Sequence, residues 1–181
     1  MTHKKFLIIL ATAITCYAWS PVLASDVVSK QDWLVALITI DSQVSSGVSY
    51  RDFVRSTSDM QTKARLLELN DATEENTKRI QFGSHIAQIM QDTKRLWSVM
   101  FGNDCAMHDR QTDKWIILLD TPARTQCGRD GQALATELYK KYKINYYVGG
   151  ALFVSDELRE MLEILSEDIA KAVAFEKGKQ H

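Results

Sequence analysis

The sequence predicts a mainly α-helical, single-domain bundle of about five helices. Apolar residues recur at helical spacing over several long segments, and two of these segments begin with a capping pattern. The chain also has only 8 glycines and 2 prolines among its 181 residues. So few helix-breaking residues favour long helices over a β-fold with many turns. Residues 25–181 are long enough to bury one core, so we expect one helical domain there.

The first twenty-four residues have the pattern of a secretory signal peptide. Lys4 and Lys5 form a basic start, Phe6–Ile14 is apolar, and Val22 and Ala24 occupy the two positions that a signal peptidase reads. We therefore expect residues 1–24 to be removed by cleavage near Ala24. The mature chain would then be periplasmic or secreted.

Two other interpretations of this leader stay open. As a lipoprotein signal it would use Cys16, although the preceding Ala13–Thr15 fits such a site poorly. As an anchor, its apolar run is shorter than the roughly 20 residues that a bilayer requires. No later apolar run is long enough to cross a membrane, so no integral span is expected after signal removal.

The charge of the mature chain is balanced. The leader holds two of the 22 basic residues and none of the 23 acidic ones, which leaves residues 25–181 with a net charge of −3. This balance gives no reason to expect a nucleic-acid partner. The sequence does not determine the oligomeric state.

Cys105 and Cys127 are the only cysteines of the predicted mature chain. An even cysteine count in an oxidising compartment predicts a disulfide, which would add about 3 kcal/mol of stability on a chain-entropy model. The alternative is a metal site built from Cys105, His108 and Cys127. A structural zinc site needs four clustered ligands, and no fourth Cys or His is near. We therefore expect a disulfide, with no metal and no cofactor.

Three helices are predicted before residue 102. Ser29 with Asp32, and Ser49 with Asp52, are capping patterns that open the first two, while Thr73 opens a third that runs to about Phe101. The inward residues of the first two are Trp33, Leu34, Leu37, Ile40 and Val44, then Tyr50, Phe53, Val54, Thr57, Met60, Ala64 and Leu67. Val35 and Ile38 extend the apolar surface of the first helix, so we expect cover on more than one side.

The pattern becomes irregular between residues 102 and 154. Trp115–Leu119 is a short apolar run that periodicity assigns neither to strand nor to helix. A turn at 128–131 leads into a fourth predicted helix, from Asp130 to about Tyr142. Apolar runs at 146–148 and 151–153 flank Gly149-Gly150 and predict a β-hairpin. Whether 115–119 and 146–153 form strands of one small sheet stays open.

Ser155 is the predicted cap of a fifth helix, after which the polar residues 176–181 are expected to fray. Its inward positions are Leu158, Met161, Leu162, Leu165, Ile169 and Val173.

The segment between residues 139 and 147 mixes cations with aromatic side chains. Together with the Cys105–Cys127 loop, it is our candidate partner-binding surface. Such side chains are frequent in binding hot spots and suit an acidic partner. The alternative is the solvated end of a short helix, where basic residues suit the helix dipole. The candidate contact residues are Lys140, Lys141, Tyr142, Lys143, Tyr146 and Tyr147.

Two histidines were considered for chemistry. His108 lies among Asp104, Asp109 and Asp113 and could act as a general base, although a polar surface loop explains the same pattern. His85 lies within the third helix, with no carboxylate one turn away, and is expected to be structural. No catalytic residue is assigned.

These observations leave three functional hypotheses. The first is an exported, non-enzymatic domain that binds another exported protein, with inhibitors and immunity factors as fitting classes. The second is a small-ligand or lipid carrier with a cavity lined by Trp33, Phe53, Met90 and Trp97. The third is a hydrolase that uses His108. The lack of a familiar catalytic motif favours the first.

Overall fold

The computed structural model describes residues 28–70, 73–101, 106–118, 125–144, 147–148 and 150–178, which form five helices and a small antiparallel sheet. The mainly helical prediction is thereby confirmed. The elements are α1 (Lys30–Ser46), α2 (Tyr50–Leu67), α3 (Glu74–Phe101), β1 (Met107–Asp109), β2 (Lys114–Leu118), α4 (Thr125–Tyr142), β3 (Tyr147–Val148), β4 (Ala151–Phe153) and α5 (Val154–Lys177).

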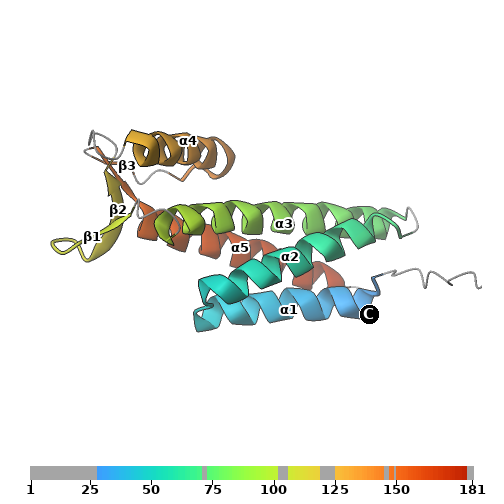
Figure 1. Cartoon of the computed structure of the whole chain (residues 1–181). Coiled ribbons are helices and arrows are strands. Elements are labelled where there is room, and N and C mark those ends of the chain that lie inside the picture. The colour runs from blue at the N-terminus through green and yellow to red at the C-terminus, as the bar shows by residue number, and fades with distance from the viewer. Residues whose placement is uncertain are drawn as a thin grey trace, which may run out of the picture.

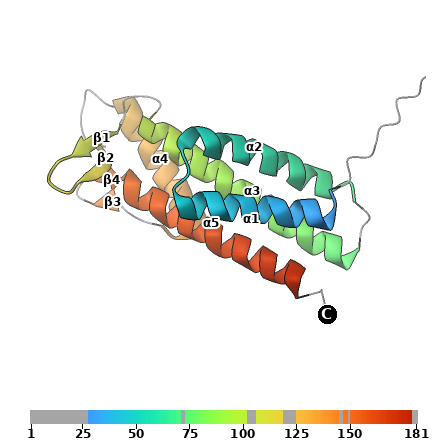
Figure 2. The ribbon, with the colours of Figure 1, turned by 90° about the horizontal axis from the view of Figure 1, so that it is seen from below.

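Helices α1, α2, α3 and α5 form an elongated bundle, with the sheet at one end (Figure 1). Helix α4 lies alongside the second half of α3, on the side of α3 away from α1 (Figures 1 and 2). The start of α1 and the end of α5 lie together at the opposite end of the bundle from the sheet (Figure 2).

The starts of the first three helices follow the sequence prediction because short-range hydrogen bonds determine them. The Ser29 hydroxyl accepts a bond of 3.1 Å from the Asp32 amide, and the Ser49 hydroxyl accepts one of 3.2 Å from the Asp52 amide. The Thr73 hydroxyl accepts from the amide three residues later, at 3.1 Å. Each bond satisfies an amide that has no partner within its own helix.

Two predicted helix starts are wrong. Helix α4 begins at Thr125, so the residues 128–131 expected to form a turn lie within it, where Gly128 and Gly131 are buried. Helix α5 begins at Val154 rather than after a Ser155 cap. Strand β4 ends at Phe153 and the helix follows directly, so the chain enters α5 with no side-chain cap.

The sheet has the strand order β1-β2-β4-β3, and all neighbours are antiparallel. The expected hairpin forms between β3 and β4, with Val148 opposite Ala151. The apolar run at 115–119 supplies β2, in which Ile117 lies opposite Leu152. Sequence analysis did not predict β1, which has only three residues and no buried side chain.

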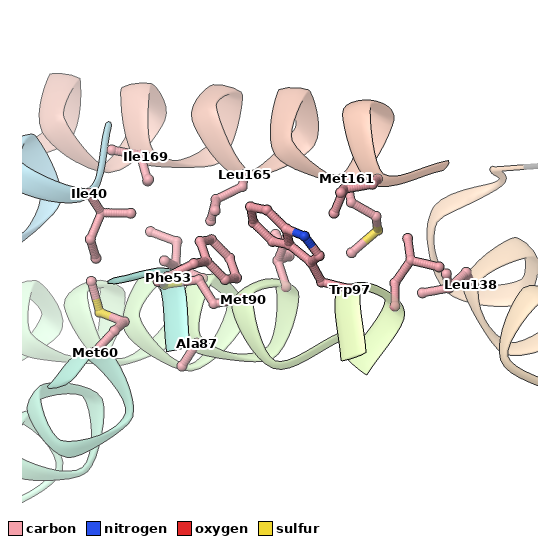
Figure 3. Close-up of a cluster of buried hydrophobic side chains, with 14 of the residues drawn as sticks. Ile40, Phe53, Met60, Ala87, Met90, Trp97, Leu138, Met161, Leu165 and Ile169 are labelled. Carbon is pink, nitrogen blue, oxygen red and sulfur yellow. The ribbon is translucent and has the colours of Figure 1, made fainter. Parts of the chain in front are cut away.

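Large apolar side chains from all the helices fill one continuous core (Figure 3). The Trp97 ring lies between α3 and α5, 5.6 Å from the Phe53 ring. Trp33 and Met90 are fully buried in the same core. The four residues considered as a ligand cavity therefore pack within the core.

Gly83 lies where α3 packs closely against side chains of α1 and α2. A β-carbon at this position would lie 3.1 Å from Leu67 Cδ1 and 3.4 Å from Trp33 Cη2. Glycine is used here because the neighbouring side chains leave little room.

We expect Gly83→Val to lower the free energy of unfolding by about 1–3 kcal/mol, because the added methyl groups overpack the helix contact. Gly83→Ala should be nearly neutral, since the higher helix propensity of alanine, worth about 1 kcal/mol, offsets the tighter contact. Urea denaturation measures both values. Ser84→Val, at the exposed neighbouring position, is the control; an equal loss there would show that β-branching rather than packing is responsible.

Candidate interaction surface on helix α4

One face of α4 is buried against the rest of the protein. Gly128, Gly131, Leu134 and Leu138 recur every three or four residues and are all buried. The opposite face is exposed, and it includes Tyr139 and Lys140. Helical periodicity therefore divides the predicted binding segment between an inner and an outer face.

A buried carboxylate on α3 holds the last turn of α4. The Asp92 side chain is only 1% exposed. Its Oδ2 atom accepts hydrogen bonds from Lys141 Nζ at 3.0 Å and from the Tyr142 hydroxyl at 2.9 Å. Gln88, one turn earlier on α3, donates to the same oxygen at 3.1 Å. Desolvation makes an unpaired buried charge costly, and these donors compensate Asp92 for the loss of water.

Glu137 adds a second bridge between α3 and α4. Its Oε1 atom accepts from Arg95 of α3 at 3.1 Å and from Lys141, one turn further along α4, at 2.7 Å. These hydrogen bonds, first from Arg95 and then from Lys141, lower the pKa of Glu137 from 4.5 to about 2. Burial and the bond to Asp92 raise the pKa of Tyr142, so its hydroxyl remains a donor at neutral pH.

Helix α4 ends at a lysine in the left-handed conformation. Lys143 has φ 64°, and its amide donates to the carbonyl of Tyr139 at 3.0 Å, which is the αL helix-ending motif. The reversal directs the chain back so that Ile144 is buried in the core. Glycine is the usual residue at such a position, because a β-carbon is disfavoured there by about 1 kcal/mol.

The side chains left on the outside form a small cationic and aromatic patch. We call Tyr139, Lys140 and Lys143 the α4 patch. Tyr139 is 50% exposed, and Lys143 Nζ lies 5.6 Å from the centre of its ring. Within the described part of the chain, neither Lys140 nor Lys143 forms an ion pair. The patch therefore offers two positive charges and an aromatic ring to a partner.

The structure separates the six predicted contact residues. Lys140 and Lys143 belong to the patch, whereas Lys141 and Tyr142 bind Asp92 and hold the helix. Tyr147 lies in β3, and Tyr146 lies outside the described residues. Sequence reasoning missed Asp92, for which the available signal was a carboxylate among the apolar residues of a long helix. Tyr139 lies in the predicted binding segment without being one of the six named contact residues, and its spacing from Leu138 places it on the outside of α4.

An open hollow of about 310 Å³ lies beside the Arg95–Glu137 bridge, between α3 and the first half of α4. Ser98 and Val99 of α3 and Leu134 of α4 contribute to its lining. Its lining is both charged and apolar, and it includes none of the α4 patch residues.

Both histidines have a carboxylate partner. His108 Nε2 lies 3.0 Å from Asp113 Oδ1 across the turn between β1 and β2, and both side chains are exposed. His85 Nε2 lies 2.8 Å from Asp168 Oδ2 of α5. The expectation that His85 lacks a nearby carboxylate holds along α3 but not in space, because α5 supplies one. Each pair orients an imidazole at the surface.

The predictions for the cysteines and for the leader at residues 1–24 lie outside what the structure describes. Cys105 lies outside the described residues and Cys127 lies in α4, so the expected disulfide falls outside the described side chains. Among the described residues, no group of three His, Cys, Asp or Glu side chains is placed to hold a metal ion. No helix in the described ranges is both long and apolar enough to cross a membrane.

Comparisons with protein-family models, curated protein sequences and solved structures found no match for this chain.

Glu137 should make the stability of the protein depend on acid pH. Its folded-state pKa lies below the ordinary value, so its contribution is fully present above about pH 4.5 and is lost as the pH falls towards 2. We expect Glu137→Gln to be less stable than the wild type at pH 6 and to lose less stability between pH 4.5 and 2. Denaturant unfolding at a series of pH values measures this difference. Glu163→Gln, on the exposed face of α5, serves as the control, and a Glu137→Gln profile parallel to that of the wild type would contradict the assignment.

Proposed function

We propose that this chain is an exported, non-enzymatic protein-binding domain, of the class that inhibits or neutralises another exported protein. In this proposal the α4 patch binds an acidic surface of the partner. The leader at residues 1–24 supports export, with the mature chain in the periplasm or secreted. The α4 patch supplies two ammonium groups and one aromatic ring for contact with the partner.

The conformation of Lys143 is the observation that carries the proposal. A left-handed lysine is less stable than a glycine at the same place, and residues held in such conformations cluster at functional sites. The strained backbone places the Lys143 ammonium over the exposed ring of Tyr139. A contact role for the lysine explains why this side chain occupies a position that favours glycine.

The surroundings of the patch also support a binding role. Asp92 and Glu137 hold Lys141 and Tyr142 in place, so the adjacent patch side chains project from a fixed helix. Fixing a surface before binding reduces the conformational entropy that binding costs. A Cys105–Cys127 disulfide, which we propose from the cysteine count, would connect the segment after α3 to the first turn of α4 and restrain the same helix.

The other two hypotheses have less support. Of the residues that would line a carrier cavity, Phe53, Met90 and Trp97 fill the core between the helices (Figure 3). Trp33 is fully buried as well. His108 is paired with Asp113 on a hairpin, and both side chains are exposed to solvent, whereas a hydrolase site usually excludes bulk water.

The proposal can be tested by affinity capture from periplasmic and secreted extracts, followed by binding measurements with the captured protein. The bait is the oxidised protein recovered after export with its own leader. The double variant Lys140→Glu/Lys143→Glu should weaken binding by about tenfold or more, because it presents two negative charges to an acidic surface. Lys143→Gly should also weaken binding, while raising the free energy of unfolding by about 1 kcal/mol.

The matched control is Arg51→Glu/Arg55→Glu, which reverses two exposed charges one turn apart on α2. This variant should bind as the wild type does. Equal binding by the α4 double variant and the wild type would contradict the proposed surface. Failure to capture any specific partner from either extract would contradict the protein-binding function.

The proposed disulfide has its own test. Thiol labelling of the denatured exported protein without reductant should modify no cysteine, and labelling after reduction should modify Cys105 and Cys127. Replacing both with serine should lower the free energy of unfolding by about 3 kcal/mol. Two reactive thiols in the unreduced sample would refute the disulfide.

A further inference from the structure

The outward face of α1 is unusually poor in charge. Gln31, Val35, Ile38 and Ser42 follow one another at intervals of four, three and four residues, which places them on one side of the helix, and all four are exposed. Val35 is 56% exposed and Ile38 is 47% exposed. Two large aliphatic side chains therefore meet water side by side, on the helix that the sequence predicts to be covered on more than one side.

Nearby polar groups do not turn this face into a charged surface. The Thr39 hydroxyl donates to the carbonyl of Val35 at 2.7 Å, and the Ser46 hydroxyl donates to the carbonyl of Gln43 at 3.2 Å. Asp41, the one charged residue between positions 33 and 46, lies on the side facing α5 and accepts a hydrogen bond of 2.7 Å from Ser166.

The neighbouring helices have a different outer surface. Exposed positions of α2 carry Arg51 and Arg55, and exposed positions of α5 carry Glu163 and Glu167. Helix α1 lies at the outside of the bundle, and no other described element covers its outer side (Figure 2). The uncharged face thus distinguishes α1 from α2 and α5, and it is open.

A groove runs along the flank of this face, between α1 and α2. It has a volume of about 240 Å³, and Val35 and Ala36 line it together with Met60 of α2. Its charged lining residues have both signs, with Asp32 on α1 and Asp59 and Lys63 on α2.

We propose that a second copy of this chain binds this face, so that the protein is a symmetric dimer with α1 packed against α1. In a two-fold contact, residues near the axis meet their own copies, so a charged face brings like charges together. The Val35–Ile38 face avoids that repulsion, whereas the outer faces of α2 and α5 do not. The exposed Val35 and Ile38 side chains of each copy pack into the α1–α2 groove of the other. Lys63 of one copy then meets Asp32 and Asp59 in the groove of the other copy.

The test is the mass of the exported protein in solution, measured by sedimentation equilibrium over a range of concentrations. The wild type should reach the mass of two chains, and Val35→Lys/Ile38→Lys should raise the dimer dissociation constant about 100-fold by placing like charges at the axis. Lys63→Glu should raise it by about tenfold, more strongly at low salt than at high salt.

Leu69→Lys is the control, since Leu69 is also an exposed aliphatic residue but follows the end of α2. It should leave the dissociation constant unchanged, and circular dichroism should show that every variant retains its helices. A wild type that stays monomeric at about 100 μM, a concentration well above the Kd of stable dimers, would overturn the proposal. So would a dimer that Val35→Lys/Ile38→Lys leaves intact, or a monomer whose α1 face binds a different protein.

Discussion

The Asp92 carboxylate is the interaction on which the position of α4 depends. It is removed from water in the second half of α3, and Lys141 and Tyr142 of α4 supply two of its hydrogen bonds. A buried charge of this kind disfavours any arrangement that takes its partners away, because the cost of an unpaired carboxylate exceeds that of most lost contacts. The last turn of α4 is thus fixed in both position and rotation.

A second buried carboxylate performs the corresponding role at the other end of α3. Glu176 of α5 is fully buried and accepts from Arg79 Nε at 2.6 Å and from Arg79 Nη2 at 3.0 Å. Glu75 and Asn76 also accept from Arg79. Helix α3 therefore carries one charged connection in each half and an apolar contact surface between them. Hydrophobic burial supplies most of the attraction, and the two ionic connections specify which helix lies where.

Sequence reasoning succeeded where the determining interactions are local. The caps at Ser29, Ser49 and Thr73 act within three residues, so the pattern predicts the helix starts directly. It failed at Gly128 and Gly131, which were interpreted as a turn, because tertiary packing determines that they lie in the buried face of α4.

The candidate site shows the same division between local and distant information. Leu134 and Leu138 define the inner side of α4, and helical spacing from them would have separated Tyr139 and Lys140 from the inner residues. The partner of Lys141 could not be predicted in this way, because Asp92 precedes it by 49 residues and belongs to another helix. The left-handed conformation of Lys143 also has no signal in the sequence, where a glycine would have been informative.

The proximity of the start of α1 to the end of α5 has a practical consequence. Lys30 Nζ of α1 lies 3.8 Å from Glu176 Oε2 of α5, so the first turn of one helix and the last turn of the other are neighbours, at the end of the bundle away from the sheet. Helix ends placed this close suit circular permutation, in which a short linker joins the end of α5 to the start of α1 and new termini are opened elsewhere. A permuted chain could be opened at the turn around Gly47, between α1 and α2. The chain segments that connect α4 to β2 and to β3 would then stay unbroken. The new termini at the α1–α2 turn would allow the protein to be immobilised from that turn. The order of strands in the sheet would not change.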